Sequence, residues 1–324
     1  MKEKILTMLR SRKDYVSGQQ MCEELGVSRT AVWKVMNQLK EEGYVIEAVS
    51  NKGYVLRESP DSVTEYELQS LIPKESIINT IVYYPELDST NNKAKELALE
   101  NKENMLIVAD TQHAGRGSKG RSWDSHKGSG IFMSFLLHPT IAPIHASRLT
   151  LIAALAVSKA IAEESNLEPM IKWPNDILLH QKKVCGILTE MSSEMDYIHY
   201  VIVGIGINVH TCKFSDELKD KATSIMLEGK TVKRSYLISR IVEYFNRYYE
   251  EFLKTEDLSA FIEEYNSLLI HKDKRIQVLS LSSRQEGIAR GIDATGSLLL
   301  ERNDGSIKTV ISGEVSLRGF HGYI

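Results

Sequence analysis

The chain has 324 residues, of which 42% are hydrophobic and 26% charged, and its 40 basic and 43 acidic side chains give a formal net charge of −3. This length and composition predict a globular protein of two or three domains. They exclude a uniformly basic nucleic-acid coat and an acidic disordered tail. The longest apolar stretches, at residues 149–156 and 200–209, are shorter than the ~20 residues that span a bilayer, so no membrane segment is expected.

The cysteine and histidine content also limits the class of protein. The first ten residues lack an apolar core followed by a cleavage site, so no secretory signal is expected. Cys22, Cys185 and Cys212 are too few and too scattered for a disulfide framework, and no H-E-x-x-H motif occurs. We therefore expect a cytoplasmic protein without a permanent metal site.

The first 57 residues have the pattern of three helices followed by a β-hairpin. Ser17 and Gln20 form a predicted capping box at the start of the second helix, and Gly26 favours its end. Ser28 is the predicted N-cap of the third helix. Two helices joined by a tight glycine-containing turn and followed by a hairpin predict a winged helix-turn-helix domain over residues 1–60.

The third helix of this domain is the candidate recognition helix for the DNA major groove. Residues 1–60 contain ten basic and eight acidic residues, a net charge of +2, so charge alone does not distinguish a DNA-binding face from a solvated one. The order of turn, helix and wing favours DNA binding. The candidate contacts lie opposite the apolar stripe of the helix and in the wing: Arg29, Thr30, Trp33, Lys34, Asn37 and Lys52.

Proline and small polar residues at 59–62 predict a linker, after which strands and helices alternate. The alternation has no regular βαβ rhythm, which predicts an α+β domain with a mixed sheet over residues 64–272. The expected strands span residues 81–84, 106–111, 131–137, 170–172, 184–191 and 199–209, and the expected helices span residues 91–99, 147–164, 235–253 and 258–268.

The last fifty residues have a different pattern. Short β-like segments alternate with turns that contain glycine, which predicts a small β-barrel over residues 273–324. The expected strands span residues 275–279, 286–293, 297–302, 308–312 and 314–317.

A glycine- and arginine-rich segment between two expected strands is the most informative part of the sequence. Residues 110–130 read DTQHAGRGSKGRSWDSHKGSG. A glycine-rich backbone can direct several N–H groups to one anion, and arginines add charge-assisted hydrogen bonds. The segment predicts a site for a phosphate or a carboxylate. Residues 113–130 are termed the lid loop, and we expect them to be mobile without ligand and ordered with it.

Two other interpretations of the lid loop are weaker. Residues 115–122 read G-x-x-x-x-G-R-S, a P-loop with arginine in place of lysine. A P-loop must lead directly into a helix, and the continuation W-D-S-H-K-G-S-G is a poor helix start. A surface loop without function is disfavoured because long loops in compact domains usually serve a function.

Four further segments place polar groups or glycines at expected element ends. Residues 172–176 read K-W-P-N-D, where Lys172 could meet a phosphate and Asp176 could hold Mg²⁺. Residues 88–92 read D-S-T-N-N and expose hydroxyl and amide groups at a helix N-terminus. The other two are K-V-C-G-I-L-T-E at 183–190 and V-G-I-G-I-N-V at 203–209, whose glycines allow close approach to a strand.

These five motifs, in this order behind a winged helix-turn-helix, resemble those of the bifunctional biotin protein ligases that also act as biotin-operon repressors. The resemblance covers essentially the whole chain, and the G-R-G…G-R-x-W loop together with K-W-P-N-D is its specific pair. It rests on residues 89–91, Gln112 with 115–117, 120–123, 172–176, 183–188, 204–208 and 313–316.

The resemblance implies a winged helix-turn-helix domain, a central mixed-sheet catalytic domain of the biotin/lipoate ligase type and a C-terminal SH3-like β-barrel. It implies that biotin and ATP give biotinyl-5′-AMP and pyrophosphate, and that the biotinyl group then passes to a lysine of a biotin carboxyl carrier protein. No protein nucleophile is required, because the biotin carboxylate attacks the α-phosphorus itself. The other implied participants are Mg²⁺, operator DNA and a ligand-promoted homodimer.

The resemblance also assigns roles to residues. It implies catalytic roles for Lys183, Arg116 and Asp176, the last placed near Mg²⁺ or the incoming lysine. The implied ATP contacts are Arg121, Trp123 (stacked on adenine), Lys172, Asn175 and Asn208. The implied biotin contacts are Ser89, Thr90, Asn91, Gln112, Gly115, Arg116, Gly117, Ser118, Lys183, Gly186, Gly204 and Gly206.

The sequence departs from the family pattern at two places. Ser118 stands where the family often has an arginine that helps to retain the acyl-adenylate, and residues 223–225 lack an aromatic residue that some relatives place against the adenine. The strength of adenylate retention and half of the nucleotide pocket are therefore open. Two other functions also stay open at this point: a non-catalytic, metabolite-sensing repressor, and a ligase for another acyl cofactor such as lipoate or octanoate.

Overall fold

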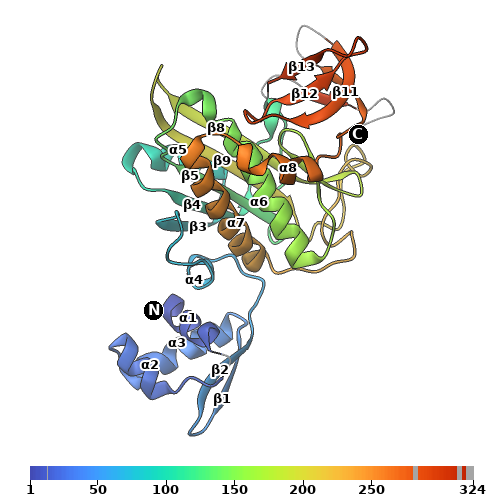
Figure 1. Ribbon diagram of the computed structural model, residues 1–324. Coiled ribbons are helices and arrows are strands. Elements are labelled where there is room, and N and C mark those ends of the chain that lie inside the picture. Colours follow the sequence, from blue (N-terminus) through green and yellow to red (C-terminus); the bar gives the residue numbers. More distant parts are fainter. Residues whose placement is uncertain (13, 280–283, 312–315, 319–324) are drawn as a thin grey trace.

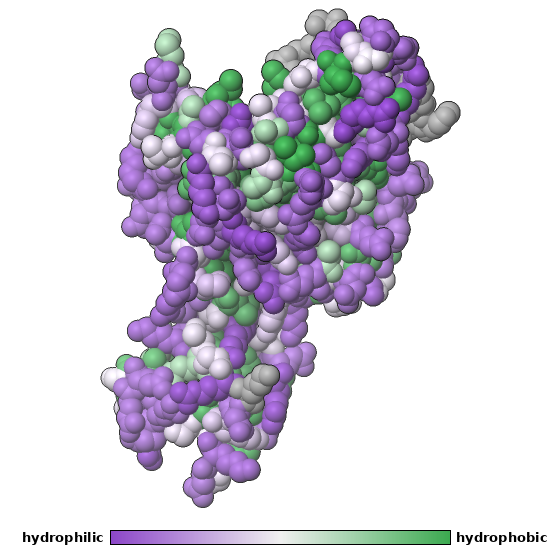
Figure 2. Space-filling model, viewed as in Figure 1, coloured by the Kyte–Doolittle hydropathy of each residue, from purple (hydrophilic) through white to green (hydrophobic). Residues whose placement is uncertain are grey.

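The computed structural model describes residues 1–12, 14–279, 284–311 and 316–318. Three units follow one another along the sequence: a helical N-terminal domain, a large central domain and a C-terminal sheet (Figure 1). The molecule narrows between the N-terminal domain and the central domain (Figure 2). The face of the molecule shown in Figure 2 is predominantly hydrophilic.

The N-terminal domain has the predicted three helices and antiparallel hairpin. The Ser17 and Ser28 hydroxyls cap the second and third helices, where they accept hydrogen bonds from the backbone N–H groups of Gln20 and Ala31 at 3.0 and 3.2 Å. The predicted return bond of the capping box differs, because the Gln20 side-chain oxygen accepts a charge-assisted bond from Arg12 at 2.6 Å. The elements are α1 (Lys2–Ser11), α2 (Gly18–Leu25), α3 (Arg29–Glu41), β1 (Val45–Val49) and β2 (Gly53–Glu58).

This domain has a hydrophobic core of its own. The apolar stripes of its helices meet over the base of the hairpin, and Leu6, Met21, Met36 and Leu39 are among its fully buried side chains. The segment that follows is more ordered than a linker: Ser59 is buried, and a short helix that the sequence did not predict, α4 (Glu65–Gln69), begins soon after it.

The central domain is built on a seven-stranded mixed sheet, as predicted. The strand order is β3-β4-β5-β9-β8-β7-β6, and only the β3–β4 pair is parallel. Six of these strands were expected from the sequence, and the four-residue β7 was not. The strands are β3 (Thr80–Leu87), β4 (Met105–Gln112), β5 (Gly130–Leu137), β6 (Met170–Lys172), β7 (Asp176–Leu179), β8 (Lys182–Ser193) and β9 (Ile198–Asn208).

Helices cover both faces of this sheet. In Figure 1, α6 and α7 lie across one face, where Phe135 of β5 stacks on Phe245 of α7 with ring centroids 4.3 Å apart. Alternate residues of each strand point to the other face, which α5 covers. The helices are α5 (Thr90–Glu100), α6 (Arg148–Ser165), α7 (Arg234–Thr255) and α8 (Ile262–Leu268), with short 3-10 turns at η1 (Ser118–Gly120), η2 (Pro143–His145) and η3 (Ser259–Phe261).

Within the described part of the chain, residues 143–165 form one helical segment that is long and apolar enough to cross a membrane by those criteria alone. Most of it is buried between the sheet and its neighbouring elements, as in the core helix of a globular domain. Its apolar character is therefore accounted for by packing.

The C-terminal strands form an antiparallel sheet in the order β13-β12-β11-β10-β14, which agrees with the β-structure predicted for this part of the chain. The inward side chains of this sheet join the core of the central domain, and the Trp173 indole N–H donates to the Gly296 carbonyl at 3.0 Å. Most of the motif expected at residues 313–316 lies outside the described residues. The strands are β10 (Arg275–Leu279), β11 (Arg284–Ile292), β12 (Leu298–Glu301), β13 (Ile307–Val310) and β14 (Ser316–Arg318).

Candidate functional site

The candidate site lies on the α5 face of the central sheet, where three glycines leave the backbone bare. Gly186 of β8 pairs with Gly206 of β9, and Gly204 lies two residues away on the same face. A Cβ atom on Gly206 would lie 2.6 Å from the Trp123 ring, and one on Gly204 would lie 2.1 Å from the Asn91 side-chain oxygen. The floor of the site therefore requires glycine, because the Trp123 and Asn91 side chains approach it closely. Close approach of a ligand to these glycines stays a prediction.

One end of the site is a buried network of neutral polar groups at the N-terminus of α5. The Gln112 side-chain oxygen accepts from the backbone N–H of Thr90 at 2.9 Å and from its hydroxyl at 3.2 Å. The Ser134 hydroxyl lies 2.8 Å from the Thr90 hydroxyl and 2.7 Å from the Asn91 side-chain oxygen. Buried polar groups of this kind are costly unless they are paired, so the network holds Thr90 and Asn91 in fixed positions.

A carboxylate extends this network beneath the lid loop. The Asn91 side-chain amide donates to Glu190 at 2.8 Å, and Lys95 donates to the other oxygen of that carboxylate at 2.7 Å. Burial raises the pKa of Glu190, but these two hydrogen bonds and the positive charges of Lys95 and Arg116 lower it further, so the net shift is downward. Glu190 is therefore a fixed negative charge near the lid-loop arginine.

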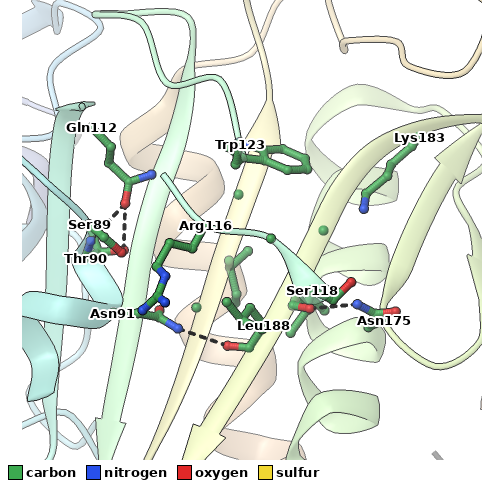
Figure 3. Close-up of a pocket in the computed structure, with 16 residues that line it drawn as sticks. Ser89, Thr90, Asn91, Gln112, Arg116, Ser118, Trp123, Asn175, Lys183 and Leu188 are labelled. Carbon is green, nitrogen blue, oxygen red and sulfur yellow. Dashed lines mark hydrogen bonds between the residues drawn. The ribbon is translucent and has the colours of Figure 1, made fainter. Parts of the chain in front are cut away.

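The opposite end of the site carries Lys183. Its ammonium lies 2.5 Å from an Asp176 carboxylate oxygen and 5.4 Å from the centre of the Trp123 ring. The backbone of Lys183 exchanges hydrogen bonds of 2.8 and 2.9 Å with Lys221 and Thr223. The lysine is thus held by a carboxylate, an aromatic ring and the backbone of residues 221–223. Figure 3 shows Trp123 between Gln112 and Lys183.

Two adjoining cavities meet at this lysine. An inner cavity of about 40 Å³ lies over the glycine floor, and an outer cavity of about 180 Å³ lies beyond it. Gly117, Ser118, Trp123 and Lys183 line both. The inner cavity is also lined by Ser89, Thr90, Asn91, Gln112, Arg116, Asn175, Gly186, Ile187, Leu188, Gly204, Ile205 and Gly206 (Figure 3), and the outer by Arg121, Ser122, Asp124, Asn208, Phe214, Leu218, Lys221 and Ala222.

Most of the predicted site residues therefore gather in one place, and three lie elsewhere. Gly115 lines neither cavity, and its carbonyl accepts a hydrogen bond from the Trp123 backbone N–H within the lid loop at 2.8 Å. Asp176 binds Lys183 from β7 without lining either cavity. Lys172 is buried on β6, paired in register with Asp176, and it also lines neither cavity.

The lid-loop arginines are held close to the site. Arg116 donates to the Asn92 side chain at 3.1 Å, and Arg121 donates to the Ser118 hydroxyl at 2.8 Å. Ser118 stands at the position where the family often has an arginine. Its hydroxyl here binds the side chain of Arg121, three residues further along the loop. Whether the loop orders around a ligand stays a prediction.

Sequence reasoning missed several residues of the site. Ser134 is one serine within the apolar strand β5 and carried no motif signal. Glu190 ended the K-V-C-G-I-L-T-E motif at 183–190, but no role was predicted for it. Phe214 and Leu218 come from a stretch of irregular structure after β9, and Phe214 supplies an aromatic side chain to the outer cavity. A search for aromatic residues in loops after strand ends could have found Phe214.

The described residues contain no group of three or more histidine, cysteine, aspartate or glutamate side chains placed to hold a metal ion. The carboxylate proposed for Mg²⁺, Asp176, binds Lys183. A divalent cation that enters with a nucleotide would therefore take most of its ligands from phosphate oxygens and water.

The candidate DNA contacts lie on the outer face of the N-terminal domain. Trp33 is 59% exposed despite its large apolar ring, and Asn37 is partly buried. Four further candidates are exposed on α3 or in the wing: Arg29, Thr30, Lys34 and Lys52. The structure therefore leaves all six accessible to a partner to some degree.

Comparisons with known proteins agree with this geometry. Residues 2–55 match the HTH domain family, residues 83–208 the biotin/lipoate A/B protein ligase family, and residues 272–318 the biotin protein ligase C-terminal domain. The bifunctional ligase/repressor BirA of Bacillus subtilis (strain 168) is 41% identical over 308 residues, which cover 94% of each chain. The chain belongs to the bifunctional ligase/repressor family.

More distant relatives agree on the whole length and on the fold. The bifunctional ligase/repressor BirA of Escherichia coli (strain K12) is 28% identical over 97% of this chain and 96% of its own length. The solved structure of the biotin protein ligase from Aquifex aeolicus in complex with biotin and ATP is 31% identical with a TM-score of 0.65, over 75% of this chain and 100% of that one.

Proposed function

We propose that this protein uses ATP to convert biotin to biotinyl-5′-AMP, transfers the biotinyl group to a lysine of a biotin carboxyl carrier protein, and represses transcription by binding operator DNA in the cytoplasm. The observation that carries the ligase proposal is the position of Lys183, which lies where a polar inner cavity meets an outer cavity beside Trp123. A cation at that junction can bind a carboxylate from one side and a phosphate from the other.

The inner cavity suits the ureido ring and carboxylate of biotin. Thr90, Asn91 and Gln112 offer hydroxyl and amide groups at one end, where Arg116 of the lid loop binds Asn92, and Lys183 offers positive charge at the other end. The glycine floor lets a flat ring lie against the sheet. Ser89 and Ser118 complete the polar lining.

The outer cavity suits the nucleotide. Trp123 offers a ring for stacking against adenine, and Arg121 and Asn208 offer donors to phosphate or ribose oxygens. Phe214 is a second aromatic candidate for the adenine. Asn175 donates to the Ile187 carbonyl at 2.9 Å, so its role there is to hold the strand at the phosphate end.

In the first step, a biotin carboxylate oxygen forms a bond to the α-phosphorus while the bond to pyrophosphate breaks. Negative charge develops on the phosphate oxygens, and Lys183 is placed to stabilise it. Arg116, which donates to Asn92 in the structure, is the second cation proposed for this step. Mg²⁺ bound to ATP supplies further charge neutralisation. Asp176 keeps the Lys183 ammonium oriented through its 2.5 Å contact.

In the second step, the lysine amine of the carrier protein forms an amide bond with the biotinyl carbonyl carbon, and AMP leaves. The lid loop must keep water from the mixed anhydride until the carrier arrives. Arg116, Gly117 and Ser118 lie over the inner cavity and are the residues proposed for this role.

Biotin-dependent exchange of pyrophosphate into ATP tests the ligase proposal directly. Lys183→Ala should lower the exchange rate by about 10²- to 10³-fold, because preorganised charge at a developing anion contributes on that scale. Lys182→Ala, a matched lysine on the opposite face of the same strand, should change the rate less than about threefold. A wild-type rate in Lys183→Ala would refute the assigned role, and no exchange in the wild-type chain would favour the non-catalytic repressor.

The buried amide and hydroxyl groups at the end of the inner cavity favour biotin over lipoate or octanoate. An acid with an apolar end would leave these groups without partners, which sites built for hydrogen bonding reject strongly. Exchange with lipoate in place of biotin should be at least about 10²-fold slower. Equal rates for the two acids would remove the assignment to biotin.

The repressor proposal rests on the exposed polar face of α3. Biotinyl-5′-AMP should promote a homodimer whose paired domains bind a two-fold symmetric operator. Sedimentation velocity with and without biotin and ATP tests the dimer. Lys34→Ala should weaken binding to DNA from the biotin-synthesis promoter. It should also reduce the slope of the logarithm of the binding constant against the logarithm of the salt concentration by about one. A monomer that ignores this DNA in the presence of both ligands would remove the repressor function.

A further inference from the structure

A buried ion cluster lies outside the two cavities, at the first residue of α7. Arg234 is only 4% exposed, and its side chain donates to Asp61 of the linker at 2.7 Å and to Asp110 of β4 at 2.6 Å. The same guanidinium donates to the Gly130 carbonyl of β5 at 3.3 Å. One arginine thus connects the linker to two strands of the central sheet.

The two strand positions that Arg234 contacts flank the lid loop. Asp110 precedes the loop by three residues and lies two residues before Gln112 of the inner cavity. Gly130 is the last residue of the loop, and its partner across the ladder is Asn208 of the outer cavity. A shift of Arg234 would therefore move both ends of the loop.

His210 makes a second connection from the linker to the lid loop. One ring nitrogen lies 3.5 Å from the Asp61 carboxylate and 3.3 Å from the Gly128 carbonyl, and the other lies 3.0 Å from the Val232 carbonyl. Asp61 therefore reaches the end of the lid loop by two routes. We term these side chains, Arg234, Asp61, Asp110 and His210, the Arg234 cluster.

Asp61 also takes the place of a helix cap. The N-cap residue of α7 is Lys233, whose side chain makes no capping bond, and Asp61 accepts the Arg234 backbone N–H at 2.7 Å. Burial lowers the pKa of Arg234, but Asp61 and Asp110 raise it by more, so the net shift is upward. The guanidinium is therefore a permanent buried charge, and removing either carboxylate would leave it only partly compensated.

We propose that Arg234 and Asp61 are positioning residues that hold both ends of the lid loop and the linker to the DNA-binding domain through one ion cluster. The order of the lid loop and the position of the linker are then coupled, because the linker and the strand that leads into the loop each contribute a carboxylate to the same arginine. The cluster consists of protein groups alone and lies outside both cavities. The use of this coupling to relay occupancy of the site to the DNA-binding domain rests on the proposed function.

Limited proteolysis of the full-length chain without ligand tests the coupling and requires no activity. Asp61→Asn should raise the rate of proteinase K cleavage within the lid loop roughly tenfold, because an amide cannot replace the charged hydrogen bonds to Arg234. Glu58→Gln, the same chemical change on an exposed carboxylate at the end of β2, should leave that rate within about twofold. The cut sites are identified by mass spectrometry.

The reciprocal variant probes the linker. Asp110→Asn should speed cleavage within residues 59–62, although Asp110 lies on the lid side of the cluster. Unchanged cleavage of the lid loop in Asp61→Asn overturns the proposal, and this outcome decides it even if Asp110→Asn fails to fold.

Kinetics separate a positioning role from a merely structural one. In biotin-dependent exchange, Asp61→Asn should raise the KM for biotin roughly tenfold and change kcat by less, because the cluster does not touch reacting atoms. A lower melting temperature with a wild-type KM would mean a structural role only and would overturn the proposal. If the wild-type chain shows no exchange while Asp61→Asn still exposes the lid loop, the proposed function fails and the positioning role stands.

Discussion

The N-terminal domain and the C-terminal sheet are joined to the central domain by different kinds of contact. Ile276, Ala289 and Leu300 of the C-terminal sheet belong to the same hydrophobic core as the central sheet. The N-terminal domain keeps a separate core, and Arg10 and Tyr44 reach across to the fully buried Glu67 of α4 at 2.7 and 2.6 Å. The first junction is apolar and continuous, and the second is polar.

This difference indicates different mechanical roles. An apolar core has no alternative partner in water, so the C-terminal sheet should act as a fixed part of the enzyme. Ion pairs and hydrogen bonds can exchange with water, and interfaces of this kind permit domain movement. The second kind of junction therefore permits the N-terminal domain to move relative to the central domain.

The largest expected effects come from truncating a buried leucine in each of the two hydrophobic cores. Leu300→Ala should cost about 4 kcal/mol and lower the unfolding temperature of the central domain, since Leu300 is fully buried in the shared core. Leu39→Ala should cost a similar amount in the N-terminal domain alone and leave biotin-dependent exchange near the wild-type rate. Differential scanning calorimetry resolves the two transitions. If Leu39→Ala lowers both transitions equally, the two cores are not independent.

The polar junction should break at Glu67. Glu67→Gln leaves the Arg10 guanidinium without its buried carboxylate, which should cost about 3 kcal/mol at the interface. The N-terminal domain should then unfold or detach at a lower temperature while the central transition stays in place. Glu65→Gln on the exposed side of the same helix is the matched control, and equal effects of the two substitutions would exclude a special role for the buried pair.

A pH effect should appear on the apolar side of the comparison. His271 lies between α8 and β10 and is 1% exposed, and its pKa falls to about 4 because burial disfavours the charged ring, with added repulsion from Lys172 and Lys274. The unfolded chain therefore binds more protons between pH 6.5 and 4 than the folded one does. The contribution of neutral His271 to the free energy of unfolding is fully present above pH 6.5. The free energy of unfolding should fall by about 2 to 3 kcal/mol as the pH drops to 4.

His271→Gln isolates this effect from the titration of carboxylates. The variant should lose less stability than the wild-type chain over the same pH interval, as measured by denaturant unfolding at each pH. Identical pH profiles for the two proteins would show that His271 does not control acid stability.

The smallest effect concerns α3, the helix that carries the candidate DNA contacts. Ser28→Ala removes the cap of α3 and should lower the stability of the N-terminal domain by about 1 kcal/mol. Lys40→Ala, an exposed change in the last turn of the same helix, should stay within about 0.5 kcal/mol. Thermal unfolding of both variants measures the stability of the N-terminal domain. A larger loss of stability in Lys40→Ala than in Ser28→Ala would argue against the cap.

Sequence patterns predicted most elements because long apolar periodicities have few structural solutions. The apolar run in residues 149–156 lies in α6, and the predicted bounds of β6 and β10 agree with the structure. β7 was missed because its four residues between two turns are too few for a period. α4 was missed for a similar reason, since five residues carry little helical signal.

The candidate site was predictable where a motif places several polar residues together, and not where one residue acts through tertiary contacts. Residues 89–91 and the lid loop carried clear signals. In the sequence, Arg234 is an ordinary charged residue at the start of a helix. Its contacts with Asp61 and Asp110 arise only in the folded protein. The same limit applies to Lys172, whose burial depends on packing that the K-W-P-N-D motif does not encode.

The glycine floor of the inner cavity has a consequence for attempts to change which acid this protein accepts. A surface made of main chain offers no side chain to exchange, and a methyl group at Gly204 or Gly206 would collide with Asn91 or Trp123. New selectivity must therefore be engineered in the walls, where Gln112 and Leu188 can be varied in size and polarity. Libraries for altered cargo should leave the strands' glycines constant and diversify those wall positions.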